Sequence, residues 1–161
     1  MVKAVTEISA DVDARNMARL GAVQALYQME HAGTGLEGVI REYKDHRLGG
    51  EMDGSMLRHA DEAFFEDILR GTVDLQHKID NFIHRLLREG WSLKRLDATV
   101  RAILRCGVFE LIRRADVPFP TIIDQYTDIA ASFFDEGTDE ANLVNALLDK
   151  AASEVRVDEA L

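Results

Sequence analysis

Apolar positions recur at intervals of three and four along most of the chain, which is the spacing of residues on one face of an α-helix. The first such run predicts a helix over residues 14–30, with Asp13 as a plausible N-cap. Its apolar residues occupy most sides of the helix. One face carries Ala18, Ala22, Ala25, Leu26 and Met29, the opposite face carries Leu20 and Tyr27, and Val23 lies between the two faces. We therefore expect this helix to be packed on most sides, as a central element.

The same spacing predicts further helices at 36–43, 61–88, 97–115, 121–134 and 139–155. The stretch 61–88 is either one long helix or two nearly collinear ones, with Gly71 as its weak point. Two prolines at 118 and 120 separate the next helices, and Thr121 is the expected cap of the second. No β-type alternation persists for more than a few residues. The pattern predicts an all-α fold, a single compact helical domain of about six or seven helices.

Two segments lack a helical period. Residues 1–12 mix acids with isolated aliphatic residues, so we expect a flexible N-terminal arm. Residues 46–56 contain three glycines and predict an exposed loop. The helical domain is thus expected over 13–157, followed by a short tail at 158–161.

The composition and net charge of the chain exclude several classes of protein. The 161 residues are 47% hydrophobic and 30% charged, which suits a chain with a real core and excludes a disordered acidic polymer. The net charge of −10 excludes a uniformly basic nucleic-acid binder, so any nucleic-acid site must be a local patch. One cysteine, with no signal peptide and no apolar run of membrane-spanning length, predicts a cytoplasmic protein.

The charge is unevenly distributed along the chain. Residues 85–114 carry eight basic and three acidic side chains, whereas residues 121–161 carry two basic and ten acidic ones. Arg101 and Arg105 belong to the basic stretch and lie one turn apart on a helix whose other side is apolar. They either extend to solvent, pair with a carboxylate of the last two helices, or contact a partner.

Chemistry of an enzymatic kind is hardly indicated. His77, Asp80 and His84 share a helix face at a spacing that some metal sites use, but no fourth ligand is apparent, and three solvated side chains are the favoured interpretation. There is no phosphate-binding glycine loop, nucleophile elbow or zinc-type Cys/His spacing. Cys106 is expected to be a small buried apolar residue. The sequence predicts no enzyme, no cofactor and no metal.

One group of residues suggests RNA binding. Arg15 and Arg19 are one turn apart on the first helix, and Tyr27 follows two turns later. Sites for single-stranded RNA combine Lys or Arg for phosphates with an aromatic platform for bases. Taken alone the pattern is weak, because such arginine pairs are usually just solvated.

Three runs of sequence together resemble the NusB family of bacterial transcription antitermination factors. They are 19–28 (RLGAVQALYQ), 101–111 (RAILRCGVFEL, followed by Asp116-Val117-Pro118) and 143–150 (LVNALLDK), in the family's order. The resemblance implies an all-helical domain of two packed subdomains without catalytic activity.

The resemblance also implies partners. Family members bind boxA-type single-stranded RNA jointly with the small-subunit ribosomal protein that serves as NusE. The pair joins an RNA polymerase antitermination complex with other Nus factors and supports processive transcription, especially of ribosomal RNA operons. Some members self-associate, so a homodimer is a further partner to test. The RNA-binding positions implied here are Arg15, Arg19, Gln24, Tyr27, Asp139, Asn142 and Leu143.

This chain departs from the family pattern both at the first-helix positions and at the last-helix positions of that set. Its arginine cluster is thinned by Asn16 and Met17, and Asn142 and Leu143 stand where some relatives carry lysine and phenylalanine. Fewer phosphate contacts predict weak RNA binding by the isolated chain, with useful affinity only beside the ribosomal protein. The alternative is a helical protein-interaction or self-association module with little RNA binding of its own.

Overall fold

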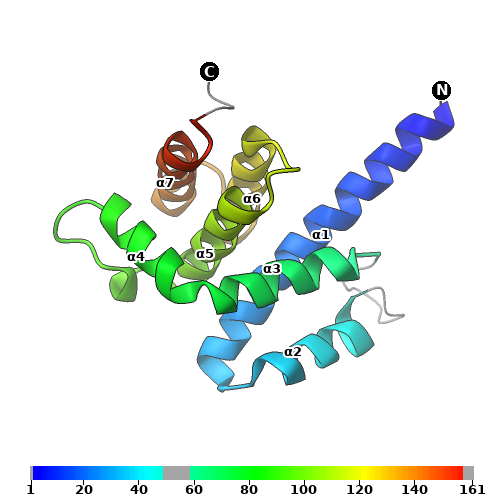
Figure 1. The fold of residues 1–161 in the computed structure, drawn as a ribbon, viewed down its shortest axis with the longest axis horizontal. Helices are drawn as coiled ribbons and strands as arrows, with labels where there is room; N and C mark the ends of the chain where they lie inside the picture. Colours follow the sequence, from blue (N-terminus) through cyan, green and yellow to red (C-terminus); the bar gives the residue numbers. More distant parts are fainter. Residues whose placement is uncertain (1, 49–58, 158–161) are drawn as a thin grey trace. The chain divides into compact units, whose positions relative to one another are not determined.

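A computed structural model describes residues 2–48 and 59–157, with side chains from residue 12 onward. Its helices are α1 (Val2–Ala32), α2 (Leu36–Glu42), the π-helical turn η1 (Tyr43–Arg47), α3 (Glu62–Asp74), α4 (Gln76–Leu86), the 3-10 turn η2 (Leu93–Arg95), α5 (Ala98–Arg113), α6 (Phe119–Phe134) and α7 (Asp139–Val155) (Figure 1). The all-α prediction is confirmed. Most of the loop expected at 46–56 and the tail at 158–161 lie outside the described residues. None of the described helices combines the length and apolarity that a membrane span requires.

The chain divides into two helical units, 1–70 and 71–161, with the division inside α3. The two expected subdomains correspond to these units. In the first, α1 begins at Val2, so residues 2–12 are helical where an irregular arm was expected, and Asp13 lies inside the helix rather than at its cap. Residues 2–12 contain no glycine or proline, and a helix already formed extends by one hydrogen bond per added residue.

The core of the first unit forms on the apolar sides of α1, α2 and α3. Leu20, Val23 and Leu26 are all buried, as expected for a helix packed on most sides. The rings of Tyr43 and Phe65 stack with centroids 5.4 Å apart, which joins η1 to α3. The same elements are linked at the surface, where Glu66 pairs with Lys44 and with Arg70.

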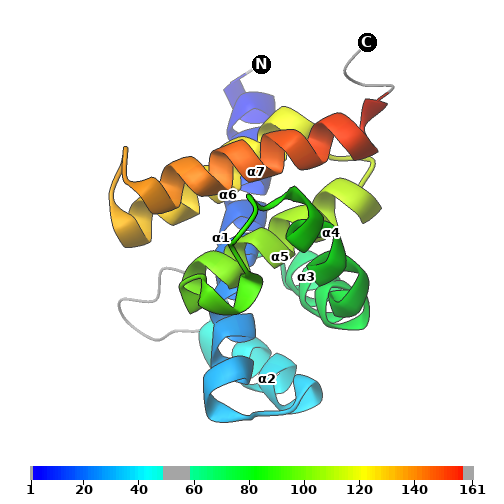
Figure 2. The ribbon, with the colours of Figure 1, turned by 90° about the vertical axis from the view of Figure 1, so that its left-hand side faces the viewer.

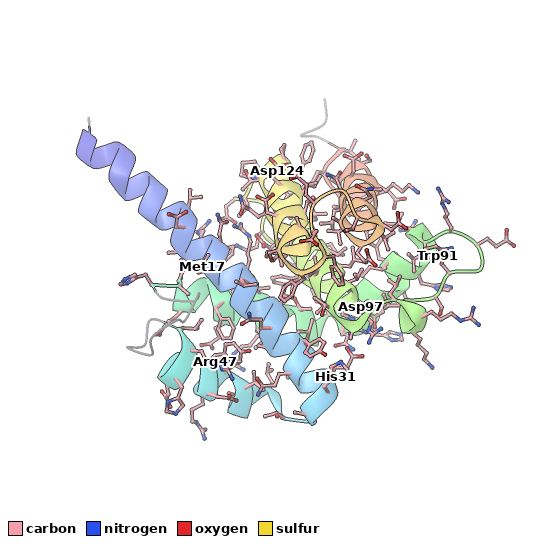
Figure 3. The ribbon with its side chains drawn as sticks, turned by 180° about the vertical axis from the view of Figure 1, so that it is seen from behind. Met17, His31, Arg47, Trp91, Asp97 and Asp124 are labelled. Carbon is pink, nitrogen blue, oxygen red and sulfur yellow. The ribbon has the colours of Figure 1, made fainter. Side chains whose placement is uncertain are left out.

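The second unit is built around α5, which is buried continuously from Val100 to Leu111. Helices α4, α6 and α7 pack against it, and Figure 2 shows α7 lying alongside α6. Asp97 begins α5 as an N-cap and accepts hydrogen bonds from the backbone of Thr99 and Val100 (Figure 3).

Three charged side chains are buried with α5, and each has a partner in the second unit. Arg105 makes a two-point ion pair with Asp80 of α4, at 2.8 and 2.9 Å. Arg101 donates to the carbonyls of Leu93 and Leu96, at 3.1 and 2.9 Å, and Glu110 accepts from the Tyr126 hydroxyl. The carboxylate of this ion pair comes from α4, whereas the expected pairing was with the acidic last two helices.

Two helix boundaries differ from those expected. The break between α3 and α4 falls at Leu75, and Gly71 lies inside α3. Helix α6 begins at Phe119, two residues before the expected cap Thr121, with Pro120 in its first turn. Proline is tolerated there because the first backbone N–H groups of a helix have no partner within it.

Candidate nucleic-acid interface

Arg15 and Arg19 share one aromatic partner at the start of α3. Their guanidinium carbons lie 4.6 and 4.9 Å from the centre of the Phe64 ring. At the same place the backbone N–H of Asp61 donates to the carbonyl of Ala14, at 3.0 Å, which fixes the start of α3 against α1. Cation–π contact of this kind holds a guanidinium in place without neutralising its charge.

The two arginines differ in exposure. Arg15 is half-buried, whereas Arg19 has 2% of its surface exposed and donates to the Asn16 side chain at 2.8 Å. The expected solvent-facing pair is therefore one accessible arginine and one packed arginine. Arg19 is buried because α1 is a central helix of its unit. One turn beyond Arg15, the same side of the helix is packed against other residues.

Tyr27 and Gln24 continue along α1 toward its C-terminal end. Gln24 is half-buried, and Tyr27 is 40% exposed. The Tyr27 ring lies 4.2 Å from that of His31, tilted by 36°, and His31 sits at the last turn of the helix (Figure 3). An exposed aromatic pair of this kind is suited to contact a nucleobase.

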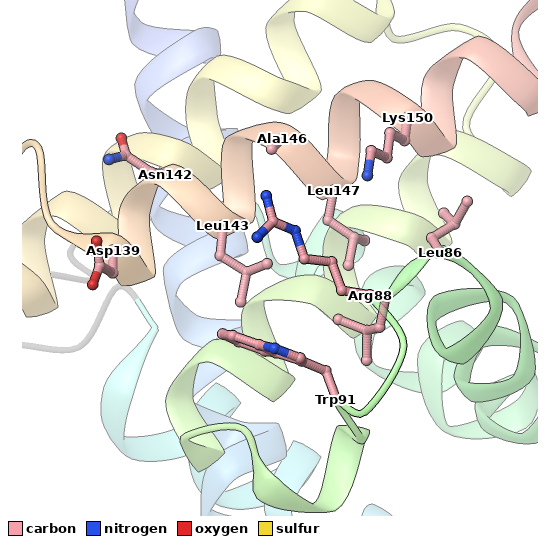
Figure 4. A pocket seen from close by; sticks show the side chains of 10 residues that line it. Leu86, Arg88, Trp91, Asp139, Asn142, Leu143, Ala146, Leu147 and Lys150 are labelled. Carbon is pink, nitrogen blue, oxygen red and sulfur yellow. The ribbon is translucent and has the colours of Figure 1, made fainter.

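The other three candidates lie in the second unit, at the start of α7. Thr138 caps the helix by accepting from the backbone of Ala141, which leaves Asp139 and Asn142 exposed on its first turn. Leu143 is half-buried and lines a groove together with Trp91 (Figure 4). The seven candidates thus form two sets, four residues on α1 in one unit and three on α7 in the other.

The alternative metal face does not form a site in the described part of the chain. Asp80 is held by Arg105, and His77 and His84 are exposed on α4. No group of three His, Cys, Asp or Glu residues suited to a metal occurs among the described residues. Cys106 is fully buried, and burial, reinforced by the charge of Glu110, raises the pKa of its thiol to about 12.

Sequence reasoning missed Phe64 and Trp91. Phe64 is far from Arg15 and Arg19 in sequence, so no local pattern links them. Trp91 lies between Gly90 and Ser92, in the gap between the helices predicted at 61–88 and 97–115. Its large apolar side chain was the available signal, because tryptophan is highly buried on average.

Comparison with known proteins gives a consistent result. The model of the NusB family matches residues 16–153. The transcription antitermination protein NusB of Rhizobium meliloti (strain 1021) is 49% identical over 148 residues, which covers 92% of this chain and 91% of the relative. That of Caulobacter vibrioides is 50% identical over 145 residues, covering 90% of this chain and 96% of the relative.

Solved structures share the fold. T. maritima NusB superimposes with a TM-score of 0.73 at 30% identity, covering 90% of this chain and 95% of that one. A structure of the antitermination factors NusB and NusE in complex with double-stranded RNA gives a TM-score of 0.71 at 21% identity, covering 88% and 97%. At that identity the likeness is one of fold.

Proposed function

Because this chain belongs to the NusB family, we propose that it is a transcription antitermination factor that binds boxA-type single-stranded RNA jointly with the small-subunit ribosomal protein NusE. The observation that carries the proposal is the family match over residues 16–153, supported by relatives about 50% identical that are transcription antitermination proteins. The complex would join RNA polymerase and other Nus factors in the cytoplasm. The protein's role is to bind and not to catalyse.

The roles of the α1 residues follow from their exposure. Arg15 supplies the phosphate contact, and Tyr27 supplies a platform for a base. Arg19 is a positioning residue, because its buried guanidinium packs on the Phe64 ring that also carries Arg15. Gln24 is half-buried on the same helix, and its amide can donate a hydrogen bond to a sugar or a base edge.

The α7 residues are a second proposed set of RNA contacts, in the other unit. Asn142 offers an amide for hydrogen bonds, and Leu143 offers an apolar contact, whereas Asp139 discourages close approach of a phosphate.

With a single accessible arginine on α1, the electrostatic contribution to affinity is small, because each neutralised phosphate adds about 0.7 to the salt slope of single-strand binding. The ribosomal protein must therefore supply the remaining contacts.

The test replaces Arg15 with Gln and measures binding of labelled boxA RNA in the presence of the ribosomal protein. We expect affinity to fall and the slope of log K against log salt to decrease by about 0.7, because one phosphate contact is lost. Arg41→Gln is the matched control, since Arg41 is an exposed arginine of α2 in the same unit. Equal affinities and slopes for both variants and wild type would contradict the role of Arg15 and favour a protein-interaction module with little RNA binding.

A further inference from the structure

A groove of about 410 Å³ runs along α7 in the second unit, between that helix and the segment joining α4 to η2 (Figure 4). Its walls are apolar, formed by Leu86 and Leu87 on one side and by Leu143 and Leu147 on the other. Trp91, Arg88 and Lys150 line it as well. None of these three was a candidate from the sequence.

Trp91 is the most unusual residue of the groove. It is the one tryptophan in the sequence, and 51% of its surface is exposed. Its backbone N–H donates to the carbonyl of Arg88 at 3.0 Å across a tight turn, in which Gly90 has a φ of +87°. This is the geometry of a type II turn, in which the third residue needs a positive φ and is therefore usually glycine. The turn holds Arg88 and Trp91 at its two ends, so that both side chains reach the groove.

The two cations of the groove make no polar contact through their side chains within residues 2–48 and 59–157. Arg88 and Lys150 are exposed, and neither forms an ion pair or side-chain hydrogen bond with any residue that the structure describes. Arg85, one turn before Arg88, behaves differently and pairs with Glu154 at 2.9 Å. In a chain of net charge −10, two available cations beside an exposed indole form a local site that complements an anion.

The combination fits one unpaired nucleotide better than a protein segment. Single-strand binding sites pair aromatic side chains, on which bases stack, with cations that follow the backbone. Here the groove has one aromatic face, apolar walls and two cations in its lining, in a volume at the small end of ligand sites. The carboxylate of Asp139 also lines the groove, at the start of α7, so the two cations outnumber the one acidic side chain of the lining. A docked helix would instead require a row of apolar anchors at i, i+3, i+4 and i+7.

We propose that Arg88, Trp91 and Lys150 form a nucleotide-binding subsite, in which an unpaired base of the RNA stacks on the indole and the flanking phosphates contact the two cations. This inference rests on the proposed function, since it assigns residues that would hold part of the same RNA. It extends the α7 set, because Asn142 and Leu143 line the same groove.

The tryptophan itself is the probe. The chain is mixed with the ribosomal protein and titrated with single-stranded boxA RNA, while the indole emission is recorded with the Trp91→Phe variant as the blank. A stacked base quenches indole emission, so we expect quenching that saturates together with the anisotropy of labelled RNA. Emission that does not change while the RNA binds would overturn the subsite. Emission that changes on adding the ribosomal protein alone, with no further change on adding RNA, would indicate that the ribosomal protein occupies the groove. That result would also overturn the subsite.

Variants test the energetics. Trp91→Ala should weaken RNA binding by about 5- to 150-fold, the range for loss of one stacked base, and Trp91→Phe should retain most of the affinity. Replacing both Arg88 and Lys150 with glutamine removes two positive charges and should lower the slope of log K against log salt by about 1.4. Lys78→Gln with Arg113→Gln is the matched control, because it removes two exposed cations that lie outside the groove.

The outcomes separate the two proposals. If wild-type chain and ribosomal protein bind no boxA RNA, the proposed function fails. If they bind it and Trp91→Ala binds equally well, the proposed function stands and the subsite fails. Thermal unfolding of each variant checks that a loss of binding is not a loss of fold; Trp91 is half exposed, so its replacement should leave the melting temperature nearly unchanged.

Discussion

Gly71 illustrates how one residue determines a contact between two helices. A glycine inside a helix normally costs about 1 kcal/mol relative to alanine, yet α3 continues through this position. A Cβ atom at Gly71 would lie 2.1 Å from the ring of Phe109, well inside van der Waals contact. The missing side chain is therefore what lets the aromatic ring of α5 seat against α3.

Substituting Gly71 with alanine should lower the free energy of unfolding by about 1–3 kcal/mol, because the core must move to accept the added methyl. Gly38→Ala is the control: Gly38 lies in α2, where a Cβ would be 3.7 Å from its nearest neighbour, and the gain in helix propensity should leave stability unchanged or higher. Urea unfolding of both variants measures the difference. Combining Gly71→Ala with Phe109→Leu should cost less than the two single changes added together, and strict additivity would contradict the proposed clash.

The thiol of Cys106 should be inert in the folded chain. Its pKa is raised from 9.0 to about 12 by burial, so the neutral thiol persists in the folded state at a pH where the unfolded chain holds a thiolate. The contribution of this pKa difference to the free energy of unfolding is fully present below pH 9.0 and is lost as the pH rises toward 12. At pH 9 we expect a thiol reagent to react with native protein at the rate of unfolding and with denaturant-unfolded protein at once. Equally rapid reaction of the native form would contradict the burial.

At the scale of an element, α5 depends on a residue from beyond the end of α7. The Arg156 guanidinium is buried and donates to carbonyls of Glu110 and Leu111, in the last turn of α5, and of Arg114 and Val117 just after it, at 2.8 to 3.3 Å. The last carbonyls of a helix lack partners within the helix and attract positive charge. Arg156 therefore caps α5 and ties α7 to it.

Arg156→Ala should lower the free energy of unfolding by at least about 3 kcal/mol, because several buried carbonyls lose their donor at once. The free energy of unfolding of Arg156→Lys should lie between those of wild type and Arg156→Ala, because one ammonium cannot reach every carbonyl in this arrangement. Arg113→Ala, which removes an exposed arginine from the last turn of the same helix, should change stability by less than about 0.5 kcal/mol. Denaturant unfolding provides the comparison, and similar values for Arg156→Ala and Arg113→Ala would contradict the capping role.

Elements also show what sequence can and cannot predict here. Periodicity located the helices well, because a helix in either unit buries a stripe that recurs every three to four residues. It missed the helical start of α1, since residues 2–12 carry no such stripe. It could not assign the partners of Arg105 and Arg156, because a carboxylate and carbonyls from distant segments bind them. Nor could it tell that Arg19 is packed while Arg15 is accessible.

At the scale of the whole molecule, charge governs the proposed activity. An overall charge of −10 repels RNA, so attraction must come from local cations such as Arg15 on α1 and the pair Arg88 and Lys150 beside the α7 groove. With so few contacts, the salt-dependent share of affinity is small for the chain alone. A second protein that adds cations to the same RNA changes this balance most, so we expect tight binding only when the two proteins bind jointly.

The most direct test is an anisotropy titration of labelled boxA RNA with the chain alone, the small-subunit ribosomal protein alone and the two together, at about 50 and 200 mM salt. We predict weak binding by the chain alone and much tighter binding by the pair, with the affinity of the pair falling as salt rises. Failure of the pair to bind at either salt concentration, or binding no tighter than that of the ribosomal protein alone, would contradict joint binding of the RNA by the two proteins.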